Sequence, residues 1–333
     1  MPLSTSLKRW LLLVTLTLVW GMNWSVMKIG ATELPPLWFR ALSLLLGTTL
    51  LGGVGIARGV SLRLPRGTLA TVIGLAAPNI MVWYSVVTVA VTLLPAGRAA
   101  ILGFTMPVWA ALIGVVLYRE RLNARTWIGV AASLASVALL VIGEWSTLVG
   151  RPTGVVLMLV AAVSWAWGTH AMRRATVKLD ASGLDTLALT FWMMLVSCPV
   201  LFAASAAMEW PLWQMPQGKA WWPILYNAVL VLAIGNLIWF WLTRTLTPVA
   251  SGLSAMLIPV VGVFSGIALL GEIPQWRDIA ALMLVCVAVG SVLVRRDSSR
   301  KVSASAPAKA PSDHNLQSVA STAYARHRKE ENP

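Results

Sequence analysis

Charge is scarce in this sequence, and acidic charge is scarcer than basic charge. Of 333 residues, 12 are Asp or Glu and 26 are Lys or Arg, and charged residues make up 11% of the chain. The surface of a soluble domain carries about 25–35% charged side chains, so this composition excludes a soluble globular protein. The net charge of +14 could suit nucleic acid, but the basic residues are scattered over short segments between apolar runs. That distribution is typical of a membrane protein.

Cysteine and the common cofactor motifs are also scarce or missing. The two cysteines, Cys198 and Cys286, lie within apolar runs, which excludes a disulfide framework and a cysteine metal site. The sequence has no GxxxxGK[ST] loop for ATP and no His-Glu-x-x-His pair for zinc. We therefore expect no cofactor, no metal and no ATP-driven step.

Long apolar runs are what the sequence does have, and they recur over most of its length. Hydrophobic residues make up 58% of the chain, and a run of about 20 apolar residues spans a bilayer as a helix. The pattern predicts an all-α polytopic membrane protein with ten transmembrane helices. Their predicted ranges are 10–30, 37–57, 68–92, 96–118, 126–143, 153–174, 184–207, 221–243, 249–270 and 277–294.

Lysine and arginine gather on alternate connections between these helices. The basic group contains Lys8, Arg9, Arg58, Arg63, Arg66, Arg119, Arg121, Arg125, Arg173, Arg174, Lys178, Arg244, Arg295 and Arg296. The other connections carry only Arg151 and Lys219. Because basic loops stay in the cytoplasm, we predict a multi-pass protein of the cell (inner) membrane with both termini cytoplasmic.

The chain repeats itself. Residues 107–142 match 259–294 at a constant offset of 152, and the matched pairs include Pro107 with Pro259, Gly114 with Gly266 and Glu120 with Glu272. Earlier in each half, Trp20-Gly21 with Asn23 corresponds to Trp167-Gly168 with His170, and Asn79 corresponds to Asn236. Each half, 1–150 and 151–296, holds five predicted helices, and an odd number forces the second half to enter the membrane from the opposite side. The sequence therefore predicts an inverted repeat, as in transporters that work by alternating access. Residues 297–333 are polar and basic, and we expect a disordered cytoplasmic tail.

These motifs resemble the drug/metabolite transporter superfamily, in its ten-helix type with two EamA-like repeats. The Trp20-Gly21 pair, Asn23, Arg40 and the two Pro-to-Glu segments carry the resemblance, which covers roughly residues 10–295. It implies an exporter of small metabolites, often amino acids, and the chain looks most like aromatic amino acid exporters. One departure is that Arg40 has no clear basic counterpart in the seventh helix.

Four polar residues, Asn23, Asn79, His170 and Asn236, lie well inside predicted helices, at repeat-related positions. Polar residues at membrane depth are candidates for function, and Asn both donates and accepts hydrogen bonds, which suits an amino acid zwitterion. The alternative is that they form helix–helix hydrogen bonds.

Aromatic residues surround these polar positions. The candidate wall contains Trp20, Trp83, Tyr84, Trp167 and Trp239. Such a wall could stack an aromatic or large apolar side chain. The alternative is an interfacial belt, since tryptophan is enriched where helices meet the membrane surface. With the four polar residues, these five make up the predicted substrate site.

Basic and acidic residues near the spans give two further expectations. Lys28, Arg40 and Arg98 lie near the outer ends of their helices, where snorkelling to the headgroups is expected; the alternative is that one of them attracts a substrate carboxylate at the outer gate. No Asp or Glu lies in the middle of a span, which disfavours proton-coupled antiport and export of cationic drugs. We therefore favour a facilitator or exchanger, or weak coupling through His170.

Prolines and small residues mark bends and packing. Pro107 and Pro259 predict bends in the fourth and ninth helices. The fifth and tenth helices, with Ala131-x-x-x-Ala135, predict packing helices that could form a homodimer.

Other functions remain as alternatives. One is export of another metabolite class, such as a drug, a sugar or a nucleotide derivative. An intramembrane serine protease built on Ser254 and His170 fits poorly because its motif is incomplete, and a selective channel would need a filter motif.

Overall fold

The computed structural model describes residues 5–119, 122, 124–147, 153–239 and 248–293. The described residues belong to one compact unit, Met1–Val294. Their structure is helical throughout, with short connections. The α-helices are α1 (Thr5–Glu33), α2 (Pro36–Ala57), α3 (Leu69–Ala76), α4 (Trp83–Leu93), α5 (Ala96–Gly103), α6 (Met106–Tyr118), α7 (Ala124–Thr147), α8 (Thr153–Ala181), α9 (Thr186–Glu209), α10 (Trp221–Leu225), α12 (Pro248–Leu270) and α13 (Trp276–Leu293). Two π-helices, η1 (Ala77–Val82) and η4 (Tyr226–Gly235), and two 3-10 turns, η2 (Trp210–Leu212) and η3 (Gly218–Ala220), complete the order.

All ten predicted spans correspond to helical segments of this unit. Among the described residues, eight helices are long and apolar enough to cross a membrane, and the described apolar part of α12, Leu257–Leu270, is shorter. The chain is therefore an all-helical polytopic membrane protein. Glu120, the predicted end of the span at 221–243, and the tail 297–333 lie outside the described residues.

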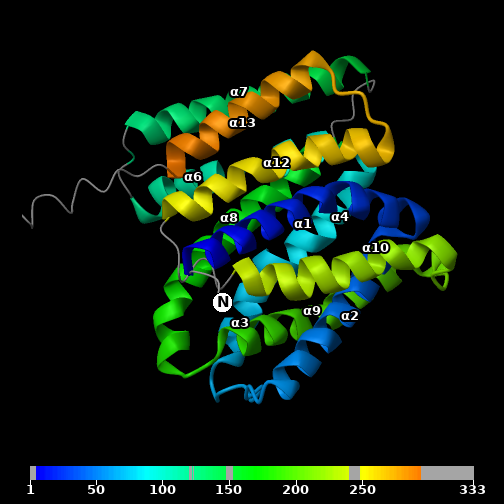
Figure 1. The fold of residues 1–333 in the computed structure, drawn as a ribbon, viewed down its shortest axis with the longest axis vertical. Coiled ribbons are helices and arrows are strands. Elements are labelled where there is room, and N and C mark those ends of the chain that lie inside the picture. Colours follow the sequence, from blue (N-terminus) through cyan, green and yellow to red (C-terminus); the bar gives the residue numbers. More distant parts are fainter. Residues whose placement is uncertain (1–4, 120–121, 123, 148–152, 240–247, 294–333) are drawn as a thin grey trace, which may run out of the picture. The chain divides into compact units, whose positions relative to one another are not determined.

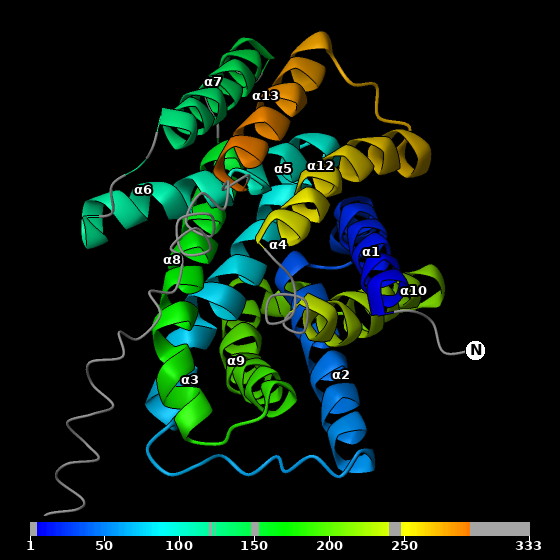
Figure 2. The same cartoon turned by 60° about the vertical axis from the view of Figure 1, so that its left-hand side comes forward.

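Helices from the two halves pack in pairs that the repeat relates. α1 packs on α12, and its counterpart α8 packs on α5 and α6. α2 packs on α9, and α7 lies beside α13 (Figures 1 and 2). These contacts between the halves are related in pairs or correspond to themselves, as a two-fold relation requires. A dimer surface on α7 and α13 stays a prediction.

The fourth span, predicted as 96–118 with a bend at Pro107, is interrupted at that position. α5 ends at Gly103 and α6 begins at Met106, with Pro107 in its first turn. Thr105 stabilises the break, because its hydroxyl donates to the Leu102 carbonyl at 2.6 Å and accepts from Trp109 Nε1 at 3.0 Å. α12, by contrast, runs through Pro259 without interruption.

The third and eighth spans each contain a π-helical stretch, which is rare and frequently lies at functional sites. Asn79 in η1 donates its side-chain amide to the Leu75 carbonyl at 2.8 Å, and Asn227 in η4 donates to the Pro223 carbonyl at 3.0 Å. The carbonyl of Pro78 accepts from Ser164 at 3.0 Å. The widened turns thus have their polar groups satisfied by side chains.

Candidate substrate cavity

Two adjoining compartments lie inside the bundle. The central compartment has a volume of about 50 Å³ and is lined by Trp20, Asn23, Trp24, Met27, Trp83, Tyr84, Val87, Phe104, Met106, Trp165 and Val231. The second, which we call the vestibule, has a volume of about 290 Å³ and is lined by Asn79, Ile80, Tyr84, Trp165, Thr169, Met172, Arg173, Leu179, Thr186, Leu189, Thr190, Met193, Asn236 and Trp239. Tyr84 and Trp165 line both, so the two compartments adjoin. Together they lie near the lower limit of small-molecule sites, about 300–1,000 Å³.

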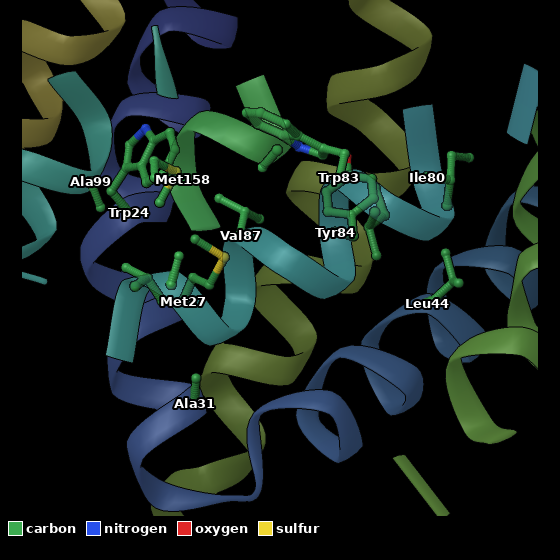
Figure 3. Close-up of a cluster of buried hydrophobic side chains, with 14 of the residues drawn as sticks. Trp24, Met27, Ala31, Leu44, Ile80, Trp83, Tyr84, Val87, Ala99 and Met158 are labelled. Carbon is green, nitrogen blue, oxygen red and sulfur yellow. The ribbon is translucent and has the colours of Figure 1, made fainter. Parts of the chain in front are cut away.

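Aromatic residues form the walls of the central compartment. Trp83 and Trp165 approach with ring centroids 5.1 Å apart, and Trp20 and Trp239 with centroids 5.6 Å apart. One pair joins the third span to the sixth and the other joins the eighth to the first, so the pairs occupy repeat-related places. Figure 3 shows Trp83, Tyr84 and Val87 in the same buried cluster as Trp24 and Met27.

Two side chains that line the central compartment each carry a buried polar atom without a hydrogen-bond partner among the described residues. The two atoms are Trp20 Nε1, a donor, and Asn23 Oδ1, an acceptor. A buried polar atom left without a partner costs about 1–3 kcal/mol. Both atoms belong to side chains of the cavity wall, so a rotation of either side chain would bring its unpaired atom to a ligand.

The compartments reach one end of the bundle and not the other. Leu179 and Thr186, which line the vestibule, flank the turn between α8 and α9. We call this the Asp185 end, after the residue that begins α9, and the opposite end the Glu272 end. The Asp185 end carries the arginine-rich connections.

Toward the Glu272 end, close helix contacts shut off the central compartment. A Cβ on Gly97 of α5 would lie 3.3 Å from the Val263 Cα of α12, and one on Gly262 would lie 2.6 Å from Ala100 of α5. Ser25 and Ser265 are hydrogen bonded at 2.8 Å between α1 and α12. Small residues therefore let these three helices touch.

Ion pairs close the same end. Glu272 accepts from the backbone N–H groups of Ala96 at 2.7 Å and Gly97 at 3.2 Å, at the start of α5, and pairs with Lys28 at 3.2 Å. Arg98 pairs with Asp278 at 2.5 Å. A carboxylate is favoured at a helix N-terminus because it meets free N–H groups and the positive end of the dipole. These four side chains line a separate hollow of about 450 Å³ that shares no residue with the central compartment.

Seven of the nine predicted site residues line the compartments. Trp20, Asn23, Trp83 and Tyr84 line the central compartment, and Asn79, Asn236 and Trp239 line the vestibule. The sequence motifs thus identified lining residues in three spans, the first, the third and the eighth.

The other two, Trp167 and His170, line neither compartment. On α8 it is Trp165 that faces the cavity, and Trp167, about 200° further round the helix, is half exposed. His170 is buried against α6, with Nε2 2.8 Å from the Ala110 carbonyl and its ring 5.0 Å from that of Tyr118.

The prediction that the three basic residues extend to the lipid headgroups is wrong for Arg40 and Arg98. The Arg40 side chain is fully buried, and Arg98 is buried and paired with Asp278. Lys28 donates to the Leu94 carbonyl at 2.7 Å as well as to Glu272. All three find partners inside the bundle, so none needs the headgroups.

Sequence reasoning missed part of the wall and one polar residue. Phe104 and Met106 enter the central compartment only because the fourth span breaks there, and Pro107 was the available signal. Asn227, fully buried in η4, was not singled out. An Asn in the middle of an apolar run is the signal that could have identified it.

Comparison with known proteins identifies relatives over most of the chain. Residues 8–142 and 152–294 each match the EamA-like transporter family. The chain is 24% identical to the uncharacterized transporter YoaV of Bacillus subtilis, over 83% of this chain and 94% of that one. It is 29% identical to the uncharacterized inner membrane transporter YedA of Escherichia coli, over 83% and 88%. A protein of Salmonella typhimurium named "Probable amino-acid metabolite efflux pump" is 24% identical over 82% and 91%.

A solved crystal structure shares the fold. It aligns with a TM-score of 0.60 at 20% identity and covers 85% of this chain and 96% of its own. The paired family match covers both predicted halves, which confirms a transporter and rules out the protease alternative. The chain belongs to the EamA-like transporter family, and it is a secondary transporter of the membrane, not an enzyme.

Proposed function

We propose that this transporter exports amino acids with aromatic or large apolar side chains by alternating access around the central compartment. One observation carries the proposal: tryptophan side chains line the central compartment, and two of its wall residues carry a buried polar atom with no partner among the described residues, Trp20 Nε1 and Asn23 Oδ1. The walls suit an aromatic side chain, because ring pairs add about 0.5–1.5 kcal/mol beyond burial. Asn23 Oδ1 suits a substrate ammonium group, which only donates.

In this proposal the vestibule is the route of entry. Asn79, Asn236 and Trp239 contact the substrate before it reaches Trp83 and Tyr84. Trp167 and His170 have no place in the proposed site, since their side chains lie outside both compartments.

The basic connections indicate which side of the membrane the vestibule faces, and this side agrees with export. If the arginine-rich Asp185 end is cytoplasmic, the vestibule faces the cytoplasm and the Glu272 end is shut to the outside. This arrangement is the loading state of an exporter. The name of the relative described as a probable amino-acid metabolite efflux pump supports the same direction and substrate class.

Counterflow in proteoliposomes tests the proposal. Vesicles are loaded with unlabelled amino acid, and uptake of labelled Phe, Trp, Tyr, Leu, Lys and Glu is measured, with and without a pH gradient. We expect saturable uptake of the aromatic members. Trp83→Ala should lower that uptake about tenfold, because it removes a ring from the wall.

Trp127→Ala is the matched control. Trp127 is half exposed on α7 and lines neither compartment, so its uptake should equal that of the wild type. Absence of saturable uptake of every amino acid would overturn the proposed substrate class and leave the fold intact.

A further inference from the structure

Arg40 is fully buried in the middle of the bundle and holds four spans together. Its Nε donates to Thr88 Oγ1 at 2.8 Å, one Nη to Asn227 Oδ1 at 3.1 Å, and the other Nη to Met27 Sδ at 2.7 Å. Its guanidinium carbon lies 4.9 Å from the centre of the Tyr84 ring. Every one of these partners is electrically neutral.

No described carboxylate pairs with Arg40. Three carboxylates inside the bundle have other partners. Glu209 accepts from the N–H groups of Leu37 and Trp38. Glu272 accepts from the start of α5 and pairs with Lys28, and Asp278 pairs with Arg98. Taking a cation out of water without a counter-charge costs several kcal/mol. A ligand that brings a negative charge therefore has more to gain here than at any neutral position of the wall.

Two side chains link Arg40 to the wall of the central compartment. Met27 and Tyr84 both contact the guanidinium and both line the compartment. A thioether sulfur is a weak acceptor, and an unbranched Met side chain changes rotamer readily. A carboxylate oxygen that took the place of Met27 Sδ would exchange a weak hydrogen bond for a charge-assisted one.

The neighbouring position on α1 completes the recognition of a zwitterion. Asn23 precedes Met27 by one helical turn and so lies on the same face, and its Oδ1 is the acceptor without a partner. Asn23 and Met27 thus lie one turn apart on the compartment wall, and Met27 contacts the guanidinium that would bind the carboxylate.

We propose that Arg40 selects substrates that carry a carboxylate, which displaces Met27 Sδ from the guanidinium when the substrate binds. This deepens the proposed function and rests on the same compartment. It predicts a preference for carboxylates over uncharged analogues of the same shape.

Calorimetric titration of the purified protein with two matched pairs of ligands tests the inference. The pairs are phenylalanine with phenylalaninamide, and phenylacetate with phenylacetamide. In the wild type each carboxylate should bind about tenfold or more tightly than its amide, the effect of one charge-assisted hydrogen bond. In Arg40→Gln the ratio should fall toward one, and Arg40→Lys should retain part of it.

Two further variants serve as a control and as an independent test. Arg98→Gln removes a different buried arginine, outside the central compartment, and should leave the ratio unchanged. Met27→Leu keeps the volume and removes the competing sulfur, so the ratio should rise; this holds even if Arg40→Gln fails to fold.

Equal binding within both pairs in the wild type, or an unchanged ratio in both Arg40→Gln and Met27→Leu, would overturn the role of Arg40. The proposed function would survive that result if phenylalanine is still transported. Conversely, Arg40-dependent binding of phenylacetate without binding of phenylalanine would support the role of Arg40 and overturn the amino acid assignment.

Discussion

The two ends of the helix bundle are held together differently. At the Glu272 end, carboxylates join separate helices: Glu209 of α9 accepts from α2, Glu272 joins α5 and α1, and Asp278 of α13 pairs with Arg98 of α5. At the Asp185 end, the Asp185 carboxylate accepts from Leu187 at 2.7 Å, within its own helix. Among the described residues, side-chain links between helices at that end are neutral or weak, such as Trp192 to the Leu62 carbonyl and Lys178 to Thr71 at 3.3 Å.

This difference explains how one end can be shut while a cavity reaches the other. Ion pairs between helices hold the Glu272 end closed. The pair of Lys28 and Glu272 is partly exposed, with side chains 23% and 18% accessible. Water can therefore solvate the charges when the pair separates. A transporter needs a closure of this kind, stable enough to seal and able to reopen.

The largest expected effect comes from removing the charge of Glu272, which holds this end closed. Glu272→Gln loses the ion pair with Lys28 and weakens the hydrogen bonds from α5, and hydrogen bonds to charged groups are worth about 1.5–3 kcal/mol. A shift of 1.4 kcal/mol changes a population tenfold. We expect the Glu272 end to open about tenfold more often or more.

Labelling of a cysteine in the central compartment measures this opening. Val87→Cys, with Cys198 and Cys286 replaced by Ala, is treated with an impermeant thiol reagent from the side of the Glu272 end. Glu272→Gln should raise the labelling rate about tenfold. Glu33→Gln, an exposed carboxylate at the same end, is the control and should not change it; equal rates in all three proteins would show that Glu272 does not hold this end closed.

A smaller effect is expected from the close contact between α1 and α12 beside the central compartment. In Gly21→Ala the new methyl group would lie 2.4 Å from Val261 Cβ, and overpacking of this kind costs about 1–3 kcal/mol. Gly53→Ala is the matched change, in α2 with no atom within 4 Å of the added carbon. We expect a lower midpoint of thermal unfolding in detergent for Gly21→Ala only. Equal midpoints would mean that α1 and α12 adjust freely.

Sequence was sufficient for the number and order of spans, because each needs about 20 apolar residues and each turn carries its own breaker. It also identified the repeat, and through it the polar and aromatic residues Asn79, Trp83 and Trp20 that line the cavity. These features depend on local composition or on comparison of the chain with itself.

Sequence was not sufficient for which face of a helix meets which neighbour. Trp165 and Trp167 differ by two positions, and only the packing of α8 on α4 decides that Trp165 faces the cavity. Arg40 lay close enough to a predicted helix end to suggest snorkelling. Its burial depends on Thr88 and Asn227, which come from two other spans and which no local pattern could bring together.

The smallest expected effect compares two equivalent helix ends, one at each end of the bundle. α12 ends with Gly271 at φ +64, and at the repeat-related position α6 ends with Arg119 at φ +52. Both backbone N–H groups donate to the carbonyl four residues earlier, Ile267 at 3.1 Å and Val115 at 3.0 Å. The two caps therefore share one geometry, but a left-handed conformation costs a non-glycine residue about 1–2 kcal/mol.

Exchanging the cap residues should act in opposite directions. Arg119→Gly relieves the left-handed strain and should raise the free energy of unfolding by up to about 1 kcal/mol, whereas Gly271→Ala introduces that strain and should lower it by a similar amount. Unfolding in detergent, followed by circular dichroism, measures both. If Gly271→Ala also raised labelling of Val87→Cys from the Glu272 end, the cap would help to hold Glu272 in place; a change in stability alone would confine its role to ending the helix.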